Sequence, residues 1–103
     1  MKSPGAIYYN FQRALNEAED LENAARKMRH LAEIEMENTK RSLGDIWQGD
    51  ASDTYRRKCS RLQAKILNSA KDLENQASAI RSMARRTYEA EMYAYRLAIE
   101  RNN

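Results

Sequence analysis

The stretch Leu43-Gly44-Asp45-Ile46-Trp47-Gln48-Gly49-Asp50-Ala51-Ser52-Asp53-Thr54-Tyr55 interrupts two long helical patterns near the middle of a 103-residue chain. It contains the chain's single tryptophan and two of its three glycines. Glycine tolerates the positive φ that ends a helix or reverses the chain, so we expect Gly44 just after a first helix and Gly49 just before a second. Asp50 suits the N-cap of the second helix, and Asp53 its first turn. The stretch therefore predicts a helical hairpin with Trp47 over its closed end.

The residues before this turn place small and apolar side chains at steps of three and four, which is the spacing of one helix face. Ser3 and Pro4 supply a cap and a first helical residue, so the first helix is expected at about 4–42. Beyond Ala32, glutamates interrupt the apolar face. The many alanines allow two helix backbones to approach closely. The predicted seam is Ile7, Phe11, Ala14, Ala18, Leu21, Ala25, Met28 and Ala32.

A second helix is expected at about 51–100, with the turn at 43–50. It carries two apolar rows at seven-residue spacing, a pattern that predicts left-handed supercoiling against a neighbouring helix. One row is Cys59, Ile66, Leu73, Ile80, Thr87 and Ala94; the other is Tyr55, Leu62, Ser69 or Ala70, Ala77 and Ala84. We expect packing within the hairpin, or between two hairpins, to involve Phe11, Leu21, Met28, Tyr55, Leu62, Ile66, Leu73 and Ile80.

The second helix is predicted to be the longer one. If the chain folds back about Trp47, Ile7 lies beside residues near position 87, and the segment from Tyr88 onward extends past the start of the first helix. That segment also contains Tyr93 and Tyr95. Exposed aromatic surface of this kind commonly marks a contact site.

Composition and residue types argue against several classes of function. The net charge of +3 is mild and arises in residues 50–103, so a basic coiled coil that binds nucleic acid is only a remote alternative. His30 and Glu33 have the spacing of two metal ligands on one helix face, but the chain has no second histidine. Cys59 is the only cysteine, which rules out an intramolecular disulfide and suggests a small core residue. Without a phosphate-binding loop or a nucleophile–base set, the sequence predicts no enzyme, cofactor or metal site.

Trp47-Gln48-Gly49 at mid-chain, followed by the small Ala51 and the aromatic Tyr55, resembles the WXG100 family of ESAT-6-like proteins. The resemblance covers essentially the whole chain. It implies an all-α antiparallel two-helix hairpin that dimerises into a four-helix bundle. It also implies a small substrate or accessory partner of a bacterial type VII secretion system, cytoplasmic before export and secreted without a cleaved signal peptide. Trp47 and Gly49 would then form part of the surface that the secretion ATPase recognises.

The C-terminal segment departs from the family pattern. In that family the export signal is Tyr-x-x-x-Asp/Glu, in which the acid comes four residues after the tyrosine. Here Tyr95 and Glu100 are five residues apart, and the residue four positions after Tyr93 is Leu97. Either a degenerate signal serves or a partner supplies it, for example a larger toxin with a helical domain for which this protein is a dedicated chaperone. Homodimer and heterodimer both remain open. The expected C-terminal docking residues are Tyr88, Tyr93, Tyr95 and Glu100.

Overall fold

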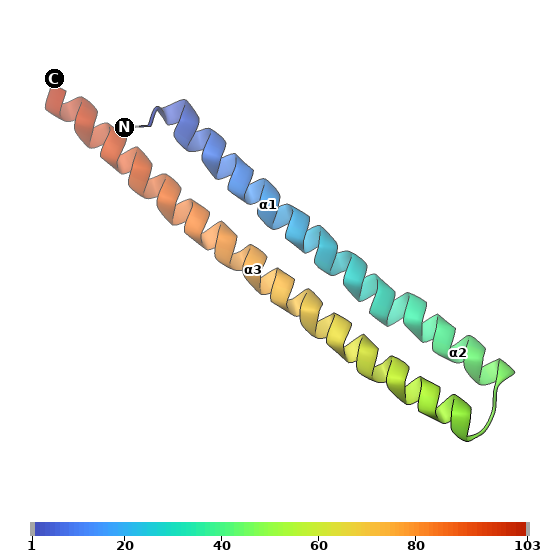
Figure 1. The fold of residues 1–103 in the computed structure, drawn as a ribbon. Helices are drawn as coiled ribbons and strands as arrows, with labels where there is room; N and C mark the ends of the chain where they lie inside the picture. Colours follow the sequence, from blue (N-terminus) through green and yellow to red (C-terminus); the bar gives the residue numbers. More distant parts are fainter. Residues whose placement is uncertain (1, 103) are drawn as a thin grey trace. The chain divides into compact units, whose positions relative to one another are not determined.

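The computed structural model describes residues 2–102, which are almost entirely helical and include no strand (Figure 1). Helix α1 covers Pro4–His30, the π-helical segment η1 covers Leu31–Glu35, α2 covers Met36–Ile46 and α3 covers Asp50–Asn102. The predicted all-helical class is confirmed.

The start of α1 is capped as the sequence predicts. The Ser3 hydroxyl accepts a hydrogen bond from the Ala6 N–H at 3.2 Å, and the Ser3 carbonyl accepts one from the Ile7 N–H at 3.0 Å. The first bond satisfies a donor of the first turn, which has no preceding carbonyl within the helix, and the second is the first regular bond of the helix to the carbonyl of its cap residue.

The first helical stretch extends further than predicted. It continues through Gly44 to Ile46 rather than ending near residue 42, and Gly44 lies inside α2. Glycine at an internal helix position costs about 1 kcal/mol relative to alanine, which is too little to end a helix that gains from packing. The expectation that Gly44 ends the helix is therefore wrong.

The chain divides into two compact units, each formed by segments of both long helical stretches. Unit one comprises Met1–Leu21 and Asn75–Asn103, of which residues 2–21 and 75–102 are described. Unit two is the continuous segment Glu22–Glu74, which includes η1, α2 and the turn before α3. In unit two the two helical arms run antiparallel (Figure 1).

The buried positions are small. In unit two, Ala25, Ala32 and Ala70 are all at most 1% exposed. In unit one, Ala77 is fully buried and Ile7 is 2% exposed. The seam alanines are therefore buried as expected, and because alanine ends at Cβ, helices that meet along such a seam can approach closely.

The inward-facing residues change phase at η1. Met28 is half-buried, so a seven-residue step would place Glu35 inward. Instead Glu35 is exposed, while Met36 and Leu43 are half-buried. A π-helical turn accommodates one extra residue, and this residue keeps a glutamate out of the seam and brings a methionine into it.

Each of the two predicted rows on α3 is only partly buried within the hairpin. Tyr55 and Leu62 are 43% and 51% exposed, so neither packs inside the hairpin. The half-buried or buried positions are one residue further on, at Arg56, Gln63 and Ala70. In the other row Cys59, Ile66, Leu73 and Ile80 are half-buried as expected, whereas Thr87 and Ala94 are exposed.

Candidate functional site

A short turn closes unit two between α2 and α3. Trp47 has an extended backbone (φ −115°, ψ 136°), and its N–H donates to the Leu43 carbonyl at 2.8 Å. Gly49 has φ 99°, the only positive value among residues 2–102, and its carbonyl accepts the Asp53 N–H at 3.1 Å. Gly49 is therefore the pivot, as predicted, whereas Asp50 is already the first residue of α3 rather than the residue before it.

The Trp47 side chain lies on the outside of this turn. It is 50% exposed, and its neighbour Ile46 is 72% exposed. The Tyr55 ring meets the indole edge to face, with centroids 6.5 Å apart and an interplanar angle of 86°. Edge-to-face contact is a favourable geometry for two aromatic rings, so Tyr55 orients the indole while half of its surface stays open. Trp47 and Tyr55 thus form an exposed aromatic pair beside Gly49.

An arginine that the sequence placed only in a basic cluster supports this end of unit two. Arg56 donates from Nη2 and Nε to the hydroxyl of Ser52, at 3.0 and 3.3 Å. Ser52 is 2% exposed. The Arg56 guanidinium lies against Gly44, where an added Cβ would be 3.3 Å from Cζ. The spacing of Ser52 and Arg56, one helical turn apart, is the only sequence signal for this arrangement.

Alanine substitutions at the two glycines of this region are expected to act in opposite directions. Gly44→Ala adds a methyl group against the flexible end of Arg56, and it removes the helix cost of glycine, so we expect a gain of up to about 1 kcal/mol. Gly49→Ala forces an L residue into positive φ, so we expect a loss of about 1–2 kcal/mol. Thermal and urea unfolding followed by circular dichroism measures both. Equal effects of the two substitutions would contradict this assignment.

Charged side chains join the arms of unit two. The Arg29 guanidinium binds the Glu74 carboxylate through both oxygens, and Arg29 Nη1 lies 3.7 Å from Glu33. The hydrogen bond from Arg29 lowers the pKa of Glu74. Hydrogen bonds from Gln63 and then from Lys40 likewise lower the pKa of Glu37. These groups lie at the surface and none of them is buried, so they set which sides of the two arms face each other more than they add to stability.

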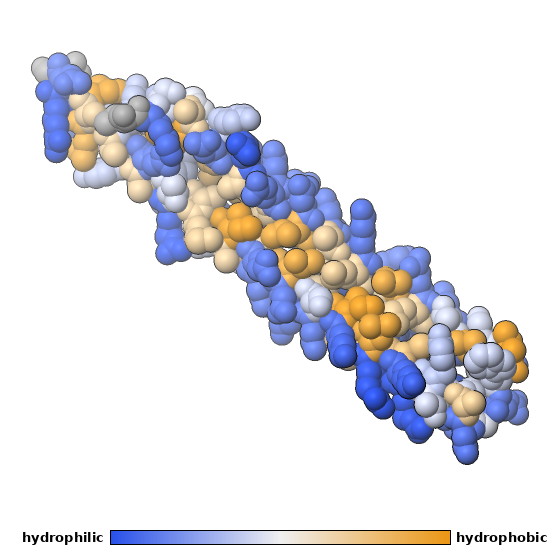
Figure 2. Space-filling view, viewed as in Figure 1, coloured by the Kyte–Doolittle hydropathy of each residue, from blue (hydrophilic) through white to orange (hydrophobic). Residues whose placement is uncertain are grey.

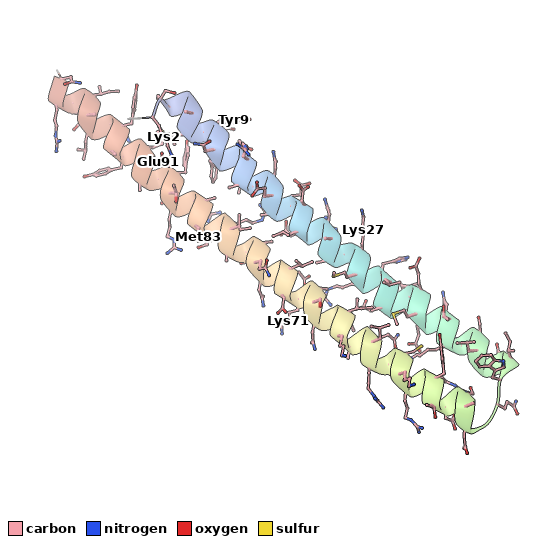
Figure 3. All side chains as sticks on the ribbon, viewed as in Figure 1. Lys2, Tyr9, Lys27, Lys71, Met83 and Glu91 are labelled. Atoms are coloured by element: carbon pink, nitrogen blue, oxygen red, sulfur yellow. The ribbon has the colours of Figure 1, made fainter. Side chains whose placement is uncertain are left out.

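In unit one, Tyr88 packs against α1. Its ring stacks on Phe11, with centroids 4.7 Å apart, and meets Tyr8 edge to face at 6.5 Å. Lys2 forms an ion pair with Glu91 at 3.1 Å (Figure 3). Ile7 and Thr87 line one groove, so the expected position of Ile7 near residue 87 is confirmed. The expectation that the segment extends past the first helix from Tyr88 onward is wrong for Tyr88, whose ring packs on α1, and for Glu91, which pairs with Lys2.

Beside this aromatic cluster lies an apolar groove of about 260 Å³. Its walls combine buried Ile7 with Met83, which is 52% exposed. The groove is lined by Ile7, Asn10, Phe11, Ala14, Ile80, Met83, Ala84, Thr87, Tyr88 and Glu91.

The other predicted docking residues remain more accessible. Tyr93 is 60% exposed, Tyr95 is half-buried and Glu100 is exposed. Their role in docking stays a prediction.

A polar hollow on α3 collects basic side chains. It is lined by Ser78, Arg81, Ser82, Arg85, Arg86 and Glu89. The glutamate offsets part of the positive charge.

Within residues 2–102, no group of three or more histidine, cysteine, aspartate or glutamate side chains is placed to hold a metal ion. No helix in that part of the chain has an apolar stretch long enough to cross a membrane.

Comparisons with protein-family models, with curated proteins and with solved structures returned no match to this chain.

Proposed function

We propose that this protein acts by binding other proteins, as a small WXG100-type substrate or accessory partner of a bacterial type VII secretion system. The observation that carries the proposal is the exposure of Trp47. Half of this large apolar side chain is open to solvent, and the core of unit two does not use it. Tryptophan is among the residues most often found at the energetic centre of protein interfaces. In this proposal the secretion ATPase reads the Trp47–Gly49 turn.

A second helical hairpin is the proposed dimer partner. Unit two exposes Leu31, Ile34 and Leu62 by 40%, 50% and 51%. Figure 2 shows hydrophobic surface facing the viewer over this part of the chain, bordered by charged residues. A paired hairpin would cover such residues and complete a four-helix bundle. The partner is either a second copy or a different helical hairpin.

A second candidate function is a dedicated chaperone for a larger secreted toxin with a helical N-terminal domain. The absence of a Tyr-x-x-x-Asp/Glu signal favours it, because the partner would then carry the export signal. The same exposed apolar residues would bind the toxin domain. In both versions the protein is cytoplasmic before export, and binding, not catalysis, is its activity.

The test combines solution mass with export. Light scattering over a tenfold concentration range establishes whether the protein alone is a stable dimer, as expected of a substrate that pairs with a second copy of itself. A monomer that forms a stoichiometric complex with a co-expressed toxin domain would favour the chaperone function. Export from cells with and without an active type VII ATPase is then compared. Equal amounts of protein outside both kinds of cell would reject both versions.

A further inference from the structure

We propose that η1 and Gln63 together fix the rotation of α2 about its own axis, and thereby the direction in which Trp47 points at the end of α2. Gln63 would be a positioning residue that acts on Trp47 from a distant point on α3. This inference concerns unit two alone and stands independently of the proposed secretion function.

The first observation is a backbone carbonyl that η1 makes available. In an α-helix the Met36 N–H would donate to the Ala32 carbonyl, four residues back. Here the Met36 N–H donates to the Leu31 carbonyl, five residues back. The Ala32 carbonyl instead accepts a hydrogen bond from Gln63 Nε2 at 2.7 Å, and the same nitrogen lies 3.1 Å from Glu37 Oε2. The Gln63 amide thus fills the place that the diverted N–H leaves.

The second observation is that the residues after η1 that contact α3 all lie on the sides of α2 that the extra residue of η1 brings toward α3. Met36 and Leu43 face the seam. Gly44 lies against Arg56, and Trp47 meets Tyr55. All of these residues on the first helical stretch follow the extra residue that η1 accommodates.

The competing state is a continuous α-helix without the π turn. It would rotate the segment after η1 by about 100° and move it by about 1.5 Å, the values for one residue. Glu35 and Ser42 would then face the seam, and Trp47 would turn away from Tyr55. Apolar burial favours the observed phase, and the Gln63 bond adds to it. One net hydrogen bond shifts a two-state equilibrium roughly fivefold.

The first test uses the fact that Trp47 is the only tryptophan of the chain. Gln63→Met keeps the length of the side chain but removes the donor. We expect a shift of the Trp47 emission maximum and a changed iodide quenching constant, at temperatures where far-UV circular dichroism shows unchanged helix content. A purely structural role would move tryptophan emission only when helix content falls. An unchanged Trp47 signal in folded Gln63→Met would overturn the proposal.

The second test removes the extra residue itself and covers the case in which Gln63→Met fails to fold. Deleting Ile34 from η1 converts the segment into a regular helix that still places Met36 and Leu43 inward. We expect wild-type Trp47 emission and a melting curve close to wild type. In this background Gln63→Met should no longer change the emission. The matched control deletes Lys65, an exposed residue of α3, where no π turn absorbs the loss. If the Ile34 deletion destabilises as much as the Lys65 deletion, η1 does not set the phase.

Discussion

Under the proposed function, Trp47→Ala is expected to reduce binding to the secretion ATPase by about thirtyfold or more, and to reduce export accordingly, in a protein that still folds. Truncating a residue at the centre of an interface costs about 2 kcal/mol or more, which corresponds to that factor in affinity. The hairpin itself should lose little, because the indole is half exposed and touches Tyr55 only by its edge. Export from cells and affinity for the isolated ATPase measure the first effect, and thermal unfolding measures the second.

Tyr9→Ala is the matched control for this substitution. Tyr9 is 62% exposed, lies in unit one and has the Arg13 guanidinium over its ring. The Tyr9→Ala substitution removes an exposed aromatic side chain of similar size that is far from the turn in sequence. We expect wild-type export from this variant. Wild-type export from folded Trp47→Ala would show that the tryptophan is not read by the machinery.

Ala25→Leu is expected to destabilise the fold of unit two strongly. Ala25 is fully buried where the two arms meet. A larger side chain must separate the arms or adopt a strained rotamer, and overpacking of this kind costs about 1–3 kcal/mol. In a helical chain with so small a core, a loss of that size should lower the thermal midpoint by several degrees. Circular dichroism and calorimetry measure the shift.

The control for Ala25→Leu is Ala64→Leu. Ala64 is an exposed residue of α3, so leucine there changes neither packing nor helix propensity by much. If both substitutions lower the melting temperature equally, the alanine seam does not hold the arms together.

The alanine seam and the helical class could be predicted because both depend on local periodicity. Ala18, Ala25 and Ala32 repeat at seven residues, and all three are buried. The start of α1 was predictable for a similar reason, since Ser3 followed by Pro4 is a cap that acts within one turn.

The features that sequence reasoning missed depend on contacts between segments. Gly44 is a helix residue that lies against the Arg56 guanidinium, a contact between α2 and α3 that no local rule anticipates. The π turn did leave a signal, since Met36 follows Met28 by eight residues instead of seven. That signal was too weak to interpret without knowing which positions faced the other arm.

The candidate site was only partly predictable. Gly49 was identified as the pivot because its backbone requirement is specific to glycine. Tyr55 was expected to pack within the hairpin or between two hairpins, because its heptad position alone could not show that the inward positions of this hairpin lie one residue later. How much of Trp47 is exposed depends on where α2 ends, and α2 ends at Ile46, further along than the sequence pattern predicts.

The small size of the buried side chains also determines how this chain responds to heat and denaturant. Five of the six buried apolar residues among residues 2–102 are alanines. Little apolar surface is therefore newly hydrated on unfolding. The heat-capacity change of unfolding should be below the usual value of about 12–15 cal/mol/K per residue. Its stability curve should be broad and shallow, and its urea dependence weak for a chain of this length. Unfolding of such a chain by heat or urea should be gradual. A modest applied force or binding energy should then suffice to separate its helices.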